Sequence, residues 1–182
     1  MVDAMAEGVL LIDAAGGVVE ANPAAADILG VSPERLAQAS LRAPGWQACR
    51  EDGTPLPRDE WSVALTRDTG EPRRRVLTGL TGPDGRRRWL EISTEAVRGP
   101  GDAPPYPVVM TFADVTERVE AEHALRASEE RFRSLFESMG EGLAVFGPDD
   151  VIEMANPAAA RILGVAPGSF TGRTLSELGW VR

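Results

Sequence analysis

The chain repeats itself at a fixed offset, and this repeat limits the folds that it can adopt more than any other feature. Residues 21–31, Ala-Asn-Pro-Ala-Ala-Ala-Asp-Ile-Leu-Gly-Val, return as residues 155–165 with a single replacement, at an offset of 134 residues. In the first copy the correspondence extends without a gap from Met5 to Trp46. The first copy then continues far beyond Trp46, whereas the second stops at Arg182. We therefore expect one complete structural unit followed by a truncated one.

The start of each copy predicts a β-hairpin followed by a short helix. Residues 8–13 are a short apolar run, and residues 18–21 resume it after a glycine-containing turn. Asn22 is a preferred N-cap, and Pro23 suits the first helical position because its missing N–H would have been unpaired there. Gly30 stands where a left-handed residue ends a helix. The pattern therefore predicts two strands and a helix capped at both ends.

The remainder of the first copy predicts further elements of the same sheet. Residues 40–60 are rich in proline, glycine and charge and are predicted to be a loop, and residues 61–67 favour a helix. Three strand candidates follow, at residues 76–80, 88–97 and 108–113. Two strands, then helices, then three strands predict an α+β fold. We expect a five-stranded antiparallel sheet with its short helices on one face.

Charge and composition argue against several classes of partner. The formal net charge is −9, and such an acidic chain repels a phosphate backbone, so no nucleic-acid partner is expected. The arginine triplets 73–75 and 86–88 flank a Gly-Pro-Asp-Gly turn and are interpreted as solvated ends of a hairpin. The N-terminus lacks the basic-then-apolar pattern of a secretory signal, and no apolar run approaches the length of a membrane span. We expect a soluble, cytoplasmic protein with no membrane segment in this part.

Segments around the end of the first copy resemble the PAS domain family. Phe112-Ala-Asp-Val-Thr-Glu-Arg118 is similar to the Asp-Ile/Val-Thr-Glu-Arg signature with which many PAS domains leave their last strand and enter a signalling helix. Residues 127–136, Ala-Ser-Glu-Glu-Arg-Phe-Arg-Ser-Leu-Phe, resemble the helix that precedes the next PAS domain in tandem receptors. Asn22-Pro23 matches the family's helix start. The resemblance implies a complete PAS domain over residues 1–118, a helical linker or signalling helix over 119–138, and the N-terminal part of a second PAS domain over 139–182.

The resemblance also implies a function. It predicts a sensory and dimerisation module of a cytoplasmic signal-transduction protein, which relays the state of a cavity through its C-terminal helix to an output domain. The alternative is a non-catalytic fragment of a PAS-containing histidine kinase of a two-component system, or of a cyclic-dinucleotide enzyme, whose enzymatic domain lies beyond residue 182. In both cases this chain itself is not an enzyme and forms a homodimer. A third class, a small-molecule-binding protein without an output, would be favoured if the gene ended at Arg182.

Three sets of residues are candidates for these roles. The relay is assigned to the junction after the last strand, where Asp114 is placed to cap the outgoing helix and Glu117 follows at capping-box spacing. Its residues are Asp114, Thr116, Glu117 and Arg118. The cavity lining, assigned from strand and helix faces, comprises Leu11, Leu29, Trp61, Leu65, Ile92, Met110 and Phe112. The dimer helix is assigned to apolar positions of the linker at spacings near three and four, namely Val119, Leu125, Phe132, Leu135 and Phe136. Ser128 followed by two glutamates predicts a fresh N-cap within this linker.

The residues that PAS cofactors require are missing. Haem needs an axial ligand in the cavity, and the single histidine, His123, lies in the linker. Light-sensing PAS domains that bind flavin carry the motif Asn-Cys-Arg-Phe-Leu-Gln, of which the only cysteine, Cys49, keeps just Cys-Arg. His123 also lacks the flanking residues of a kinase phosphoacceptor box and is interpreted as a solvated side chain. With no Cys/His cluster for a metal, we expect neither haem, flavin nor zinc, and the small-molecule ligand remains unknown.

Overall fold

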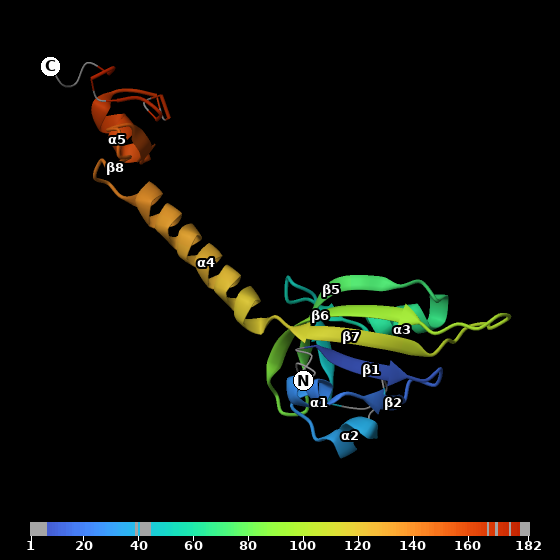
Figure 1. Cartoon of the computed structure of the whole chain (residues 1–182). Helices are drawn as coiled ribbons and strands as arrows, with labels where there is room; N and C mark the ends of the chain where they lie inside the picture. Colours follow the sequence, from blue (N-terminus) through green and yellow to red (C-terminus); the bar gives the residue numbers. More distant parts are fainter. Residues whose placement is uncertain are drawn as a thin grey trace. The chain divides into compact units, whose positions relative to one another are not determined.

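The computed structural model describes residues 7–38, 40, 45–166, 168–169, 171–174 and 176–178 (Figure 1). The chain forms two compact units, Met1–Val119 and Glu120–Arg182. Across the described ranges no helix combines the length and the apolar character needed to span a lipid bilayer. Each unit has its own sheet and its own buried cluster of side chains.

The first unit is built on one antiparallel sheet in the strand order β2-β1-β7-β6-β5-β3-β4. The strands are β1 Gly8–Ile12, β2 Val18–Ala21, β3 Gln47–Cys49, β4 Pro55–Leu56, β5 Arg73–Thr81, β6 Arg87–Ala96 and β7 Val108–Asp114. The last of these, β7, lies in the middle and pairs with β1 on one side and with β6 on the other. The strand that leads out of the unit is therefore held from both sides.

The five predicted strands are present, but the sheet has seven strands rather than five. The two additional strands, β3 and β4, lie within residues 40–60, which the sequence predicted to be a loop. They hold three and two residues, too few for an apolar alternation to be visible. Such short segments take up strand structure because a neighbour offers hydrogen bonds, here β5 to β3, and not because of their own pattern.

The first short helix begins and ends at the predicted caps. Helix α1 (Pro23–Leu29) begins after Asn22, whose Oδ1 accepts a hydrogen bond from the Ala25 N–H at 2.9 Å. It ends at Gly30, which has a φ of 65°, in the left-handed region that favours glycine. Helix α2 (Pro33–Ala37) follows, and a single 3₁₀ turn, η1 (Arg58–Glu60), precedes helix α3 (Ser62–Thr69).

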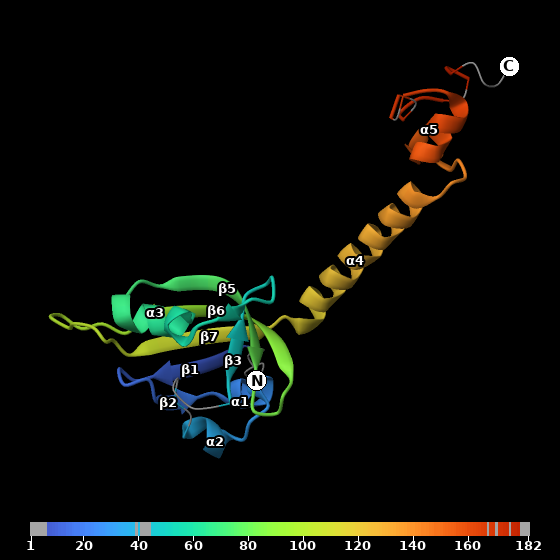
Figure 2. The ribbon, with the colours of Figure 1, turned by 180° about the vertical axis from the view of Figure 1, so that it is seen from behind.

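The core lies between one face of the sheet and these three helices, seen from opposite sides in Figures 1 and 2. Alternate residues of each strand point to the same face, and along β1 these are Leu10 and Ile12. The buried cluster draws on both layers and comprises Leu10, Ile12, Ala25, Ala26, Leu29, Leu36, Val63, Leu90, Ile92, Val108, Met110 and Phe112. Helices on one face of the sheet, as predicted, are thus confirmed.

Helix α4 runs from Thr116 to Ser138. Its first turn belongs to the first unit, because Val119 is 2% exposed and packs with Cys49 and Trp89. Trp89 is on the face of β6 opposite to the core residues Leu90 and Ile92, so the root of α4 covers the back of the sheet. The helix continues unbroken through position 128, and the fresh N-cap predicted there is not formed.

The second unit repeats the opening of the first. It pairs β8 (Ala144–Phe146) with β9 (Ile152–Ala155), and helix α5 (Pro157–Leu163) follows. Asn156 is 1% exposed, and its Oδ1 accepts hydrogen bonds at 2.9 Å from the N–H groups of Leu143 and Ala159. The Oδ1 of Asn22 accepts from Val9 and Ala25, also at 2.9 Å, and these residues correspond at the offset of 134. The repeat in the sequence is therefore a repeat in hydrogen bonding as well.

The second unit differs from the first in what covers its sheet. Among its described residues the sheet has two strands, β8 and β9. Several large apolar side chains of this unit are exposed, namely Val145, Phe146, Met154, Ile162 and Leu163. The corresponding strand of the first unit, β1, alternates between buried and half-buried residues because β7 pairs with it.

Candidate functional site

A cavity of about 100 Å³ lies between the sheet and the helices of the first unit. Its wall comes from both layers and is almost entirely apolar, with hydroxyl groups from three residues, Ser40, Ser62 and Thr78. The described lining is Leu10, Ile12, Gly16, Val18, Leu29, Leu36, Ser40, Trp46, Ala48, Leu56, Trp61, Ser62, Val63, Thr78, Leu80, Ile92 and Met110. The described part of the wall holds no acidic, basic or histidine side chain.

The structure places four of the seven predicted cavity residues on this wall: Leu29, Trp61, Ile92 and Met110. The other three are not part of it. Leu11 lies on the opposite face of β1, because its neighbours Leu10 and Ile12 occupy the core face. Leu65 is only partly buried. The ring of Phe112 packs so closely over Gly8 that a Cβ atom at position 8 would overlap the ring. Phe112 is thus part of the packed core beside the cavity and not of the wall.

Sequence reasoning missed most of the wall, for two reasons. Leu10 and Ile12 required the correct phase of a strand, and a one-residue error moves every side chain to the other face. Trp46, Ala48 and Leu56 lie in or beside β3 and β4, within the segment predicted to be a loop. Ala48 of β3 lies beside Leu56 of β4 because the two strands pair. The local sequence pattern does not predict this pairing.

The strand that touches the cavity continues directly into helix α4. Met110 lies on the wall, and four residues later Asp114 ends β7. The Asp114 carboxylate accepts hydrogen bonds from both the backbone N–H of Thr116, at 2.9 Å, and its hydroxyl group. The Thr116 Oγ1 in turn accepts the backbone N–H of Trp89 at 2.9 Å. The side chain of Thr116, the first residue of α4, is thereby bonded to both β7 and β6.

The predicted capping box is not formed at this junction. The helix starts at Thr116, so that Asp114 lies one position before the N-cap. Its carboxylate contacts the residue two positions on, as in an Asx turn, and not Glu117. The rest of the junction is ionic, since Glu91 on β6 pairs with Arg75 at 3.0 Å and with Arg118 at 3.6 Å. Arg118 thus reaches back to the sheet from the first turn of the helix.

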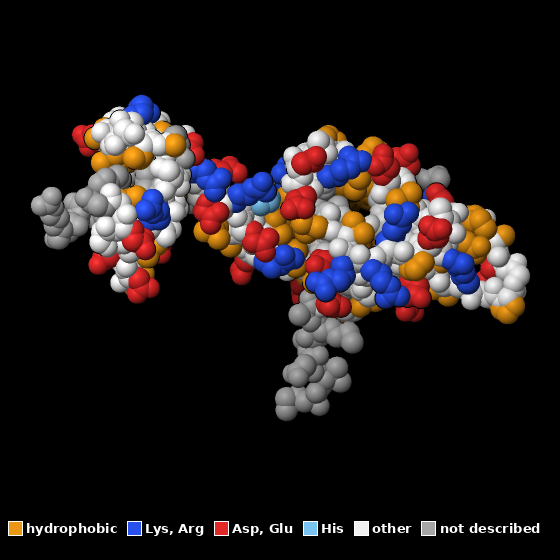
Figure 3. All heavy atoms as spheres, turned by 90° about the horizontal axis from the view of Figure 1, so that it is seen from above, with side chains coloured by type: hydrophobic (Ala, Val, Ile, Leu, Met, Phe, Trp, Pro, Cys, Tyr) orange, Lys and Arg blue, Asp and Glu red, His pale blue; other side chains and the backbone are white. Residues whose placement is uncertain are grey.

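The apolar residues of α4 separate into buried and exposed groups. The sequence predicted that Val119 and Phe136 contact a partner chain. Val119 is instead buried in the first unit and Phe136 in the second, so neither is available for such a contact. Leu125, Phe132 and Leu135 remain exposed, with 62%, 52% and 66% of their surface accessible. On the visible face of α4 acidic, basic and apolar side chains are interspersed (Figure 3). Three of the five predicted dimer-helix residues are therefore on the surface.

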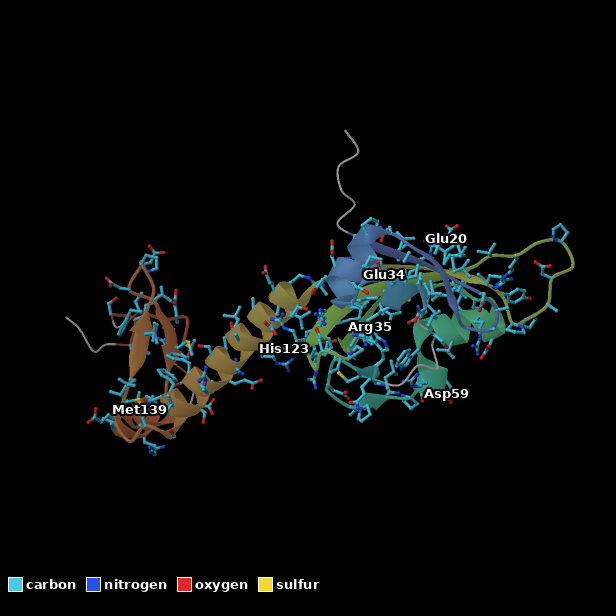
Figure 4. All side chains as sticks on the ribbon, turned by 90° about the horizontal axis from the view of Figure 1, so that it is seen from below. Glu20, Glu34, Arg35, Asp59, His123 and Met139 are labelled. Carbon is cyan, nitrogen blue, oxygen red and sulfur yellow. The ribbon has the colours of Figure 1, made fainter. Side chains whose placement is uncertain are left out.

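No group of three metal-ligating side chains occurs within the part of the chain that the structure describes. His123 lies on α4 (Figure 4), outside the lining of the cavity. Cys49 is buried against Trp89 and Val119. Neither side chain therefore lines the cavity.

Comparison with known proteins assigns the family. Residues 1–115 match the family model of the PAS fold, and residues 130–181 match a family model of a PAS domain. No curated protein is similar enough in sequence to count as a match. Among solved structures, a sensory box histidine kinase/response regulator from Burkholderia thailandensis is 21% identical, with a TM-score of 0.51 over 71% of this chain and 92% of that one. The PAS domain of nitrogen regulation protein NR(II) from Vibrio parahaemolyticus is 16% identical, with a TM-score of 0.45 over 62% of this chain and 93% of that one. The match of the PAS fold to more than half of the sequence, together with the sheet and helices described above, shows that this chain belongs to the PAS family.

Proposed function

We propose that this chain is a sensory and dimerisation module of a cytoplasmic signal-transduction protein, in which the state of the cavity is relayed through α4. The chain itself is non-catalytic, and its output lies in another domain of the parent protein. The outputs that suit such a module are a histidine kinase of a two-component system and a cyclic-dinucleotide enzyme. The family supplies the sensory half of this proposal, and the geometry of one junction supplies the relay.

The observation that carries the proposal is the connection from Met110 to Thr116. Met110 contacts the cavity, and β7 is held on both sides by β1 and β6. No glycine lies between Met110 and the start of the helix, and the hydrogen bonds of Asp114 and Thr116 close the junction. A shift of β7 is therefore passed to the helix instead of being absorbed by a flexible link.

The exposed apolar residues of α4 support the dimerisation half. Leu125 and Phe132 are seven residues apart, and Leu135 follows three residues later, so that all three fall on one stripe of a helix. Leaving several large apolar side chains in water on one stripe is unfavourable, at roughly 25 cal/mol for each Å² of apolar surface. Pairing with the same stripe of a second copy removes this surface from water. Rotation or tilt of α4 then changes the geometry of the pair.

The size and chemistry of the cavity support a small apolar occupant. Pockets for drug-sized ligands and cofactors usually measure about 300–1,000 Å³, whereas this cavity measures about 100 Å³. A dry apolar cavity of about 150 Å³ is known to take benzene. Haem and flavin exceed the available space, and the wall residues that the structure describes include no axial ligand for iron. We therefore propose that the module works without haem or flavin.

A ligand-independent perturbation tests the relay. Val63→Leu adds one methylene group to the cavity wall from α3, and amide exchange along residues 116–125 reports whether α4 responds. We expect a change in exchange at the first turns of α4 in this variant. The same substitution combined with Thr116→Val should leave exchange there equal to that of Thr116→Val alone. Equal exchange in the Val63→Leu variant and the unmodified chain would refute the relay.

A further inference from the structure

A second hollow, the outer groove, lies on the other side of the cavity wall and measures about 340 Å³. It is formed at the β3–β4 edge of the sheet. Its lining comprises Trp46, Gln47, Ala48, Cys49, Gly53, Pro55, Leu56, Pro57, Arg58, Trp61, Thr81 and Arg87. In contrast to the described lining of the cavity, that of the outer groove includes charged side chains.

The cavity and the outer groove share part of their walls. Four residues line both spaces, namely Trp46, Ala48, Leu56 and Trp61. Trp46, Leu56 and Trp61 are only partly buried, as expected for side chains with one face toward each space. A single layer of side chains therefore separates the apolar interior from the groove. Movement of Leu56 or Trp61 would join the two spaces.

Trp61 and Arg58 make polar contacts within the shared layer. The Trp61 indole N–H donates to the Leu56 carbonyl oxygen at 3.1 Å. The guanidinium of Arg58 stands 5.2 Å from the centre of the Trp61 ring and donates to the Trp46 carbonyl oxygen at 3.1 Å. Arg58 thus lies over the layer on the groove side. A group bound to Arg58 would sit directly outside the apolar cavity.

The charge of the outer groove is opposite to that of the whole chain. Its described lining contains two arginines, Arg58 and Arg87, and no acidic side chain, although the chain has a formal net charge of −9. Arg87 is exposed and has no ion-pair partner among the described residues. The planar guanidinium fork suits a carboxylate, which it can bind through two parallel hydrogen bonds. A positive groove in an acidic protein attracts a small anion selectively.

We propose that the cavity and the outer groove together form one site for a small carboxylic acid with a compact apolar body. The apolar body enters the cavity past Leu56 and Trp61, and the carboxylate remains in the groove on Arg58 and Arg87. The cavity alone would select by shape, and the arginines add selection by charge. This inference rests on the proposed sensory function and names the class of ligand that the module senses.

Calorimetric titration of the chain with three matched probes tests the proposal. Benzoate has both the ring and the charge, benzyl alcohol has the ring without the charge, and acetate has the charge without the ring. We expect benzoate to bind about tenfold or more tightly than benzyl alcohol, because a charge-assisted pair adds to the burial of the ring. Acetate should bind more weakly than either. Equal affinity for benzoate and benzyl alcohol, or no binding of benzoate, would overturn the proposal.

Two arginine variants separate the groove from general charge effects. Arg87→Gln removes a guanidinium from the outer groove and should weaken benzoate about tenfold while leaving benzyl alcohol unchanged. Arg86→Gln makes the same change of charge at the neighbouring position, outside the groove lining, and should leave both affinities unchanged. Equal losses in the two variants would show that benzoate responds only to the overall charge, and would overturn the site.

A cavity variant tests where the ring goes. Ala48→Val narrows the shared layer and should weaken benzoate and benzyl alcohol by the same factor, with folding checked by thermal melting. Loss of benzoate alone would place the ring outside the cavity and contradict the proposal. Because the Val63→Leu test of the relay uses no ligand, failure of benzoate to bind would remove this ligand class and leave the proposed function standing.

Discussion

The carboxylate of Asp114 accepts hydrogen bonds from both the backbone N–H and the hydroxyl group of Thr116. This pairing fixes the Thr116 side chain so that its Oγ1 can accept the N–H of Trp89 on β6. The hydroxyl group of Thr116, the first residue of α4, thus donates to Asp114, the last residue of β7, and accepts from Trp89 on β6. This hydroxyl oxygen is one of several links between the sheet and the helix, beside the Glu91–Arg118 ion pair and the packing of Val119 on Trp89.

Removing that oxygen should loosen the junction while leaving the rest of the unit folded. Thr116→Val keeps the shape of the side chain but leaves the Trp89 N–H without its acceptor, and we expect a loss of about 1 kcal/mol in the free energy of unfolding. Asp114→Ala should cost a similar amount, about 1 kcal/mol, because the N–H and the hydroxyl group of Thr116 lose their acceptor. Urea unfolding of the first unit measures both losses.

A control on the same strand distinguishes the junction from β7 in general. Thr111 is half-buried, and its hydroxyl makes no hydrogen bond within the described structure. Thr111→Val should therefore cost much less than Thr116→Val. In the parent protein, Thr116→Val should also uncouple the output from the stimulus. A variant that melted below the unmodified protein yet still responded normally would show that the junction only stabilises the helix.

The exposed stripe of α4 should hold two chains together. We expect light scattering to show a dimer for the unmodified chain, and a shift toward monomer for the double variant Leu125→Ala, Phe132→Ala, because both side chains are exposed in the single chain. Val119→Ala is the matched control: its side chain is buried in the first unit, so it should lower the melting temperature without changing the association. A monomer at high concentration in the unmodified chain would contradict this prediction.

The two copies of the repeat should differ in local stability. In the first unit β1 is paired on both sides, by β2 and β7, whereas in the described part of the second unit β8 is paired by β9 alone. A two-stranded sheet is marginal in water unless other elements pack on it, and the described cluster on this one, Ile152, Ala159 and Ala160, is much smaller than the core of the first unit. We expect the amides of residues 143–146 to exchange with solvent much faster than those of residues 9–12. Slow exchange at residues 143–146 in a chain shown to be monomeric would refute this expectation.

The sequence alone determined the elements whose causes are local. Asn22, Pro23 and Gly30 set the ends of α1 through their own side chains and backbone conformations. The same residue types set the ends of α5 in the second copy. Strands β6 and β7 hold ten and seven residues, enough for their apolar alternation to be visible in the sequence. The sequence did not predict β3 and β4. These two strands form because β3 pairs with β5 and β4 pairs with β3. Such pairing is a property of the folded chain and leaves no mark in a segment of two or three residues.

The candidate site was harder to predict than the fold. A wall residue is identified only when the phase of its strand and the depth of its neighbours are both known. Leu11 failed on phase, since Leu10 and Ile12 face the helices. The prediction for Phe112 was wrong because its ring packs beside Gly8 and does not reach the cavity. Met110, on the same face of β7, lines the cavity instead. Val119 failed for a third reason: α4 covers the back of the sheet, a contact that the helical pattern does not contain.

The purified chain should be colourless above the protein absorbance. The cavity measures about 100 Å³, and among the residues that the structure describes its wall offers neither an iron ligand nor a charged group for a flavin phosphate. We expect an absorbance spectrum without a Soret band and without a flavin band in the blue. Expression in a medium supplemented with a haem precursor and riboflavin serves as the control for cofactor supply. A stoichiometric chromophore that survives gel filtration would disprove this prediction.

The pH dependence of the first unit should carry a component from the Asp84–Arg88 pair. Arg88 donates to the Asp84 carboxylate at 2.7 Å, and the Arg86 backbone N–H donates at 3.0 Å. The hydrogen bonds, that of Arg88 first, lower the pKa of Asp84 from 3.8 to about 2. Because the pKa is lower in the folded state, this contribution is complete above pH 3.8 and is lost as the pH falls toward 2. The Arg88 guanidinium lies against Gly30 at the end of α1, so the pair also joins the hairpin to that helix.

Asp84→Asn isolates this component from the titration of other carboxyl groups. The melting temperature of Asp84→Asn should be lower than that of the unmodified chain at neutral pH, and the difference should shrink between pH 4 and pH 2 as Asp84 takes up its proton in the unmodified chain. Asp27→Asn removes an acidic side chain that has no ion pair in the described structure, and should show no such convergence. A difference between Asp84→Asn and the unmodified chain that stayed constant down to pH 2 would mean that the carboxylate charge is not what stabilises the turn, and that an uncharged hydrogen bond from Arg88 is sufficient.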